Sequence, residues 1–126
     1  MKAYTDLSQS KKLAKILPIE SADMYYFRQI DNDYIPPDVE FIRPIPFCKD
    51  NKVNFKYDIP CWSLAALLGI IPKHIKEFNR LRIDISDNDF AIWYDEIGYG
   101  VFKITKESPV DACYEMILGL KERNLL

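Results

Sequence analysis

Residues 59–68, Ile-Pro-Cys-Trp-Ser-Leu-Ala-Ala-Leu-Leu, contain a complete signal for the start of a helix in the middle of the chain. Ser63 can act as the N-cap, because its hydroxyl can accept a hydrogen bond from a free N–H group of the first turn. Trp62 before the cap and Leu67 after it have the spacing of a hydrophobic staple. Pro60 keeps the residue before it extended and prevents an earlier helix start. The stretch therefore predicts an extended segment followed by a helix.

The sequence after this helix predicts strands and then a second helix. Residues 81–85, 90–94 and 101–105 are rich in strand-forming residues and are separated by short turns, which indicates an antiparallel meander. Ser108 can cap a final helix, with Pro109 at its first position. One face of that helix carries Val110, Cys113, Tyr114, Ile117 and Leu120, and Met116 and Leu118 widen the apolar arc.

The N-terminal half is less regular. Residues 6–16 read as a helix capped by Thr5, and residues 24–30 read as a strand. Five of the eight prolines fall between residues 31 and 61. Pro44 and Pro46 lie two residues apart, so their missing N–H donors are on the same side of an extended chain, as in an edge strand. The segment 31–61 is therefore either a packed ribbon, the favoured interpretation, or a recognition loop that displays Phe41 and Phe47.

These segments together predict one α+β domain that spans residues 1–126. We expect an antiparallel sheet of three to five strands, with the C-terminal helix and the mid-chain helix packed on one face. The helix over residues 6–16 is expected at an edge, and a short helical turn is expected over residues 73–78.

Composition restricts the function classes. The net charge of −2 and the pI of about 5.4 disfavour a protein that binds nucleic acid without sequence preference, because such binding depends on neutralising phosphates. No window approaches the roughly 20 apolar residues that a membrane-spanning helix needs. Three widely spaced cysteines and the lack of a secretory signal indicate free thiols and a cytoplasmic protein.

No catalytic, cofactor or metal site is predicted. His74 is the single histidine and has no Cys or Asp at ligand spacing. Cys61 could be a nucleophile near a helix start, with His74 as the one possible base, but a structural cysteine is favoured. Residues 84–89 resemble the first half of a calcium loop but lack its glycine, so a β-turn is the expected structure.

One basic segment is a candidate binding site. Residues 73–82 interleave cations with Phe78, a pattern that can contact phosphates and stack a base; the cations are Lys73, Lys76, Arg80 and Arg82. A solvated connection between two elements explains the same residues. Nucleic-acid binding therefore stays an alternative, disfavoured by the acidic net charge.

Several blocks of the chain resemble a group of small uncharacterised bacterial proteins from gut-bacterial genomes, phages and mobile elements. The opening block runs from Tyr4-Thr5 through 9–14 (Gln-Ser-Lys-Lys-Leu-Ala) to Glu20-Ser-Ala-Asp-Met-Tyr-Tyr26. The other blocks are residues 60–68 and residues 108–117. The resemblance implies a bacterial cytoplasm and a mobile-element history, and it brings no activity, cofactor or catalytic residue.

We expect from these observations a non-enzymatic protein that binds another macromolecule. The favoured partner is a protein, with Phe41 and Phe47 as candidate contacts, or a second copy of the chain. Nucleic acid bound by residues 73–82 is the first alternative, and an enzyme that uses Cys61 is the second. No cofactor and no membrane partner are expected.

Overall fold

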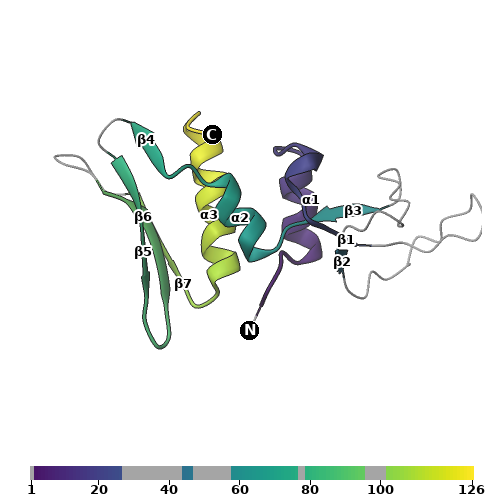
Figure 1. Ribbon diagram of the computed structural model, residues 1–126, viewed down its shortest axis with the longest axis horizontal. Coiled ribbons are helices and arrows are strands. Elements are labelled where there is room, and N and C mark those ends of the chain that lie inside the picture. Colours follow the sequence, from purple (N-terminus) through teal and green to yellow (C-terminus); the bar gives the residue numbers. More distant parts are fainter. Residues whose placement is uncertain (1, 27–43, 47–57, 77–78, 96–101) are drawn as a thin grey trace, which may run out of the picture. The chain divides into compact units, whose positions relative to one another are not determined.

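The structure is a computed structural model and describes residues 2–26, 44–46, 58–76, 79–95 and 102–126 (Figure 1). The predicted α+β class is confirmed, with antiparallel strands and a C-terminal helix, but the described strands form two sheets instead of one. The chain divides into two compact units, one made of Thr5–Ser63 and the other of Met1–Tyr4 with Leu64–Leu126. Phe41 and Phe47 lie outside the described residues.

The first unit begins with helix α1 (Leu7–Ala14), which packs on strand β3 (Ile59–Cys61). The predicted cap was wrong by one residue, since Asp6 and not Thr5 is the N-cap. The Asp6 carboxylate accepts from the Gln9 N–H at 2.8 Å, and the Gln9 amide oxygen accepts from the Asp6 N–H at 3.1 Å. This reciprocal capping box satisfies two N–H groups at the helix start. The Thr5 hydroxyl instead accepts a hydrogen bond from the Trp62 N–H at 3.2 Å.

A three-stranded antiparallel sheet completes this unit. Its order is β2 (Pro44–Pro46), β1 (Met24–Tyr26), β3, and a 3-10 helix over Ile19–Ser21 precedes β1. Tyr25 lies opposite Ile45 on one side and Pro60 on the other. Proline has no N–H, so it can occupy only the non-hydrogen-bonded pairs of an antiparallel ladder. The backbone nitrogens of Pro44, Pro46 and Pro60 therefore point away from β1. The edge position predicted for Pro44 and Pro46 is confirmed.

The second unit contains the mid-chain helix α2 (Leu64–Ile70), which starts directly after Ser63 as predicted, and a four-stranded antiparallel sheet. The sheet order is the chain order: β4 (His74–Lys76), β5 (Asn79–Ile85), β6 (Phe90–Tyr94) and β7 (Lys103–Lys106). The predicted meander is confirmed. The helical turn predicted over residues 73–78 was wrong in its described part, because His74–Lys76 pair with β5 and the Leu81 N–H donates to the Lys73 carbonyl at 2.9 Å.

Helix α3 (Pro109–Glu122) supplies the core of this unit. Ser108 caps it as predicted, accepting from the Asp111 N–H at 3.3 Å, with Pro109 at its start. The helix packs on β6 and β7, and α2 packs on α3 (Figure 1). Its buried positions are Val110, Ala112, Cys113, Met116, Ile117, Gly119 and Leu120. Near its end, Gly119 meets the ring of Phe102, the residue before β7.

Candidate functional site

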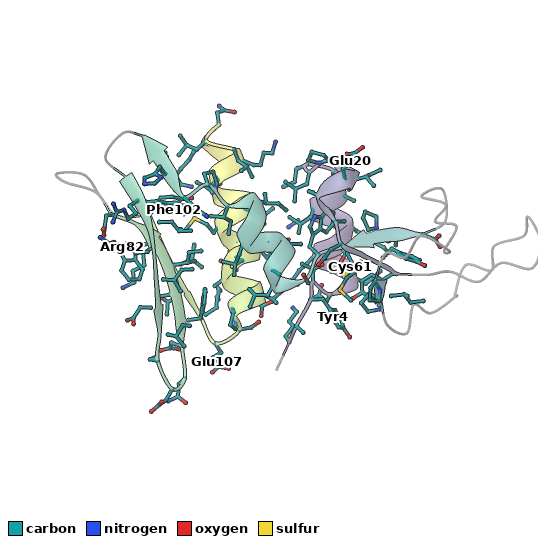
Figure 2. The ribbon with its side chains drawn as sticks, in the orientation of Figure 1. Tyr4, Glu20, Cys61, Arg82, Phe102 and Glu107 are labelled. Carbon is teal, nitrogen blue, oxygen red and sulfur yellow. The ribbon has the colours of Figure 1, made fainter. Side chains whose placement is uncertain are left out.

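The four-stranded sheet has two different faces. Phe90, Ile92 and Tyr94 alternate along β6 and are buried, since α3 packs on that strand. Trp93 lies between them in sequence, so its side chain projects from the opposite face of the sheet. Figure 2 shows Arg82 on the side of the sheet away from α3 and Phe102 on the side toward it. We call the face that carries Arg82 and Trp93 the open face.

A row of three side chains crosses the open face in register. Arg82 of β5 lies opposite Trp93 of β6, and Trp93 lies opposite Lys103 of β7. Directly opposed residues in an antiparallel pair have Cβ atoms about 5 Å apart. The Lys103 ammonium lies over the Trp93 ring, with Nζ 4.7 Å from the ring centroid. Arg82 and Lys103 are exposed and Trp93 is half-buried, so the row presents an aromatic ring between two cations.

Other charged side chains surround this row. Arg80 and Asp84 alternate with the residues between them on β5 and therefore share the open face with Arg82. Arg82 forms an ion pair with Asp95 through its Nε atom. Asp89, at the turn before β6, alternates to the same face as Trp93. These open-face residues are thus three cations and three carboxylates, with no net formal charge, whereas the whole chain carries −2. The exposed His74 of β4 lies opposite Arg80.

The structure brings part of the predicted basic segment to this face. Arg80 and Arg82 lie on β5, and the exposed Lys73 lies just before β4. The backbone of Lys76 belongs to β4, but its side chain lies outside the described residues, as does Phe78. The described part of the segment therefore belongs to the antiparallel strands β4 and β5, and it contributes two arginines to a surface completed by other strands.

Trp93 and Lys103 were missed as site residues when only the sequence was considered. Both lie on strands that are distant from residues 73–82 in sequence, and only the sheet register brings them beside Arg82. A signal was present in β6, where all five residues are apolar and alternation therefore puts one large aromatic residue, Trp93, on the face opposite Ile92 and Tyr94. An aromatic residue on the outward side of a meander strand, with cations on its neighbours, indicates such a surface.

The first unit contains a second cluster of functional groups, which surrounds Thr5 and is buried. The Thr5 hydroxyl lies 2.7 Å from the Ser10 hydroxyl and 3.5 Å from the Cys61 sulfur. The Thr5 carbonyl accepts hydrogen bonds from the Tyr26 hydroxyl at 2.8 Å and from the Cys61 thiol at 3.4 Å. Thr5, Ser10 and Cys61 have no exposed surface. The cluster therefore pairs buried polar groups with one another and joins α1 to β1 and β3.

This environment does not activate the Cys61 thiol. Burial raises its pKa above the ordinary value, and the hydrogen bonds from Thr5 and Ser10 oppose that shift only in part. A nucleophilic cysteine needs a lowered pKa and access to its substrate. Burial also raises the pKa of Cys113 to about 12, on the apolar face of α3 where the sequence placed it. Both thiols are free.

Metal and membrane sites are not found in the described ranges. Among these residues, no group of three or more His, Cys, Asp or Glu side chains is placed to hold a metal ion. Residues 86–89 form the expected turn, in which the Ser86 N–H donates to the Asp89 carbonyl at 2.9 Å and the Asp89 N–H to the Ser86 hydroxyl at 3.2 Å. None of the described helices has the length and apolar character required to cross a membrane.

Comparisons with known proteins give no further identification. No family model matches the chain, and neither the curated proteins nor the solved structures contain a match.

Proposed function

We propose that the protein is a non-enzymatic macromolecule-binding protein whose contact surface is the open face of its four-stranded sheet. The observation that carries the proposal is the row in which Trp93 lies in register between Arg82 and Lys103. Aromatic and arginine side chains are the residue types that contribute most to binding at macromolecular interfaces. The two helices of this unit lie on the other side of the sheet (Figure 1).

The environments of the two described cysteines support a non-enzymatic role. Cys61 and Cys113 have no exposed surface, and burial raises the pKa of both thiols. Each thiol is therefore protonated at neutral pH and shielded from a substrate. Their role is structural, one in a buried hydroxyl cluster and the other in the core under α3.

The proposal includes a compartment and an origin. The free thiols of Cys61 and Cys113 support a cytoplasmic location, because cysteines stay reduced in the cytoplasm. The resemblance of residues 60–68 and 108–117 to small bacterial proteins of phages and mobile elements supports a mobile-element origin. In this setting the protein binds its partner in the cell that produces it.

The test is affinity capture from a lysate of the cells that produce the protein, with three baits. The first bait is the wild-type chain, and the second carries Arg82→Ala, Trp93→Ala and Lys103→Ala. The third bait carries Lys11→Ala and Lys12→Ala, which removes two exposed cations from α1 and leaves the open face intact. Each capture is repeated after nuclease treatment, so that protein and nucleic-acid partners are separated.

We expect a macromolecule that the wild-type and the Lys11/Lys12 baits retain and the open-face bait loses. Circular dichroism and thermal unfolding of the three baits check that the substitutions leave the fold intact. Equal retention by all three correctly folded baits would contradict the open face as the contact surface.

Self-association is a second candidate, favoured by two exposed isoleucines. Ile85 is 75% exposed and Ile83 is 42% exposed, although both lie on the face of the sheet that α3 packs against. The helix packs on β6 and β7, and β5 carries these isoleucines next to that contact. Light scattering of the wild type and of Ile85→Lys tests this: a dimer that dissociates in the variant supports it, and a monomer at all concentrations rejects it.

A further inference from the structure

We propose that the occupant of the open face is a single strand of nucleic acid. One of its bases stacks on Trp93, and its phosphates bind Arg82, Lys103 and Arg80. This inference rests on the proposed function, because it names the partner of the same surface. The geometry of the row, with a cation on the strand on each side of the ring, supports it.

The geometry of the row suits a nucleotide. Neighbouring strands are about 4.8 Å apart, so the register places the backbones of Arg82 and Lys103 at about this distance on the two sides of the Trp93 backbone. A base can lie on the ring while the phosphates before and after it reach the two cations. Bases in a duplex have their faces covered by stacked neighbours, so only an unpaired strand offers a base face to Trp93.

The contact between Lys103 and Trp93 indicates how the strand is accommodated. The Lys103 ammonium lies over the ring at 4.7 Å and occupies the position that a base would take. A phosphate beside Lys103 attracts this ammonium more strongly than the ring does, because the phosphate carries a full negative charge. Lys103 then moves from the ring to the phosphate, and the exposed ring accepts the base.

An acidic protein is the competing occupant, and the ring distinguishes the two. Both partners would use Arg82 and Lys103. The face of an aromatic ring is electron-rich, so a carboxylate gains nothing from contact with the centre of the row. Stacking of a base uses the same ring favourably. The residues of the row are therefore matched by a ligand that has both phosphates and planar rings.

The test measures binding of the purified full-length chain to labelled oligonucleotides of about twenty nucleotides by fluorescence anisotropy. The probes are oligo(dT), oligo(U) and a DNA duplex of the same length, each titrated over a range of salt concentrations. We expect either single strand to bind at least about tenfold more tightly than the duplex, since base stacking is absent from duplex binding. The two single-stranded probes distinguish DNA from RNA.

Matched variants locate the binding surface. Arg82→Ala with Lys103→Ala is expected to weaken binding about tenfold or more and to reduce the slope of log affinity against log salt by about 1.4, or about 0.7 for each phosphate that is no longer neutralised. Lys11→Ala with Lys12→Ala removes the same charge from α1 and is expected to leave affinity and slope unchanged. Trp93→Ala is expected to weaken binding, whereas Trp93→Phe retains most of it because a ring remains.

Tryptophan fluorescence provides a readout that a structural role of Trp93 would not change. The chain has two tryptophans, and Trp62 has no exposed surface. Stacking of a base should therefore quench the emission of Trp93. The quenching should be absent in Trp93→Phe, although this variant still binds.

The inference would be overturned by no binding of either single strand at low salt, or by binding that the open-face variants leave unchanged. Equal affinity for duplex and single strand would also reject it, because stacking would then make no contribution. If the single strands fail to bind while lysate capture yields a nuclease-resistant protein that depends on the open face, the proposed function stands and only this choice of partner is wrong.

Discussion

The ring of Phe102 lies directly against the backbone of Gly119 in α3. A Cβ atom built on Gly119 would be 2.1 Å from Cζ of Phe102 and 3.0 Å from both Cε atoms. The guanidinium of Arg123 lies over the same ring, 4.1 Å from its centroid, and donates to the Gly119 carbonyl at 3.1 Å. The absence of a side chain at Gly119 therefore lets the start of β7 pack closely on the last turns of α3.

Gly119→Ala should destabilise the protein. The new methyl group displaces the Phe102 ring and its contact with Arg123, and overpacking of this kind costs about 1–3 kcal/mol. Gly69→Ala is the matched control, because a Cβ at this exposed position in α2 has no neighbour within 4 Å. It should stabilise by about 0.5–1 kcal/mol, as expected for glycine replaced by alanine inside a helix. Urea unfolding measures both changes.

A double-mutant cycle tests whether Phe102 causes the effect of Gly119→Ala. In a Phe102→Ala background, Gly119→Ala should cost less than in the wild type, since the obstructing ring is gone. An equal cost in both backgrounds would show that the close contact is not what requires glycine at this position.

Removal of the Thr5 hydroxyl should weaken the first unit. Thr5→Val keeps the shape of the side chain but deprives the buried Trp62 N–H of its acceptor, which costs about 1–3 kcal/mol. Thr5→Ser keeps the hydroxyl and removes one methyl group, worth about 1 kcal/mol. Denaturant unfolding monitored by tryptophan emission compares the two. If Thr5→Val were as stable as the wild type, the hydroxyl cluster would make no net contribution.

Stability should fall in alkaline solution. Burial raises the pKa of Cys113 from 9.0 to about 12, so the folded state holds its proton more tightly than the unfolded state. The resulting stabilisation is complete below about pH 9 and is lost as the pH rises toward 12, by about 1.4 kcal/mol per pH unit. The raised pKa of Tyr94, about 12 against 10.0, acts in the same direction from about pH 10.

Cys113→Ala should make this decline shallower. The free energy of unfolding is measured for wild type and variant at about pH 8 and about pH 10.5, and the difference between the two pH values is compared. The variant is less stable at pH 8 because a buried side chain has been removed, but its stability should fall less on going to high pH. Parallel declines would indicate that Cys113 does not titrate on unfolding.

The two buried thiols should react slowly with iodoacetamide in the folded protein. Cys61 and Cys113 are fully buried with raised pKa values, so they offer neither access nor thiolate. Mass spectrometry of digested samples gives the extent of alkylation at each site over time, and addition of denaturant should make both sites react quickly. Rapid alkylation of Cys61 at neutral pH without denaturant would instead support the alternative that the protein is an enzyme with Cys61 as its nucleophile.

Local signals predicted much of the second unit. The cap and first positions of α3 follow from Ser108 and Pro109, and the meander follows from alternating residues separated by short turns. The helical turn expected over residues 73–78 is not found in its described part, because pairing with β5 decides the conformation of His74–Lys76 and that pairing is not encoded in those residues themselves. The cap of α1 was misplaced because Thr5 is used by Trp62, which lies far away in the sequence.

The binding surface could be predicted only in part. The arginines of β5 were recognisable as a basic segment, because they are close in sequence. The contribution of Trp93 and Lys103 depends on the strand register, which sets Arg82 opposite Trp93 and Trp93 opposite Lys103. A one-residue change of register would move Trp93 to the other face, so no reading of single segments could assemble the row.

The prolines of the three-stranded sheet have a consequence for assembly. Pro44 and Pro46 on β2 and Pro60 on β3 turn nitrogens without hydrogen toward the outer edges of the sheet. A strand from another chain that approached the described part of either edge would find carbonyl groups but no N–H donor with which to form a ladder. Addition of a further strand at the described part of these edges is thereby disfavoured.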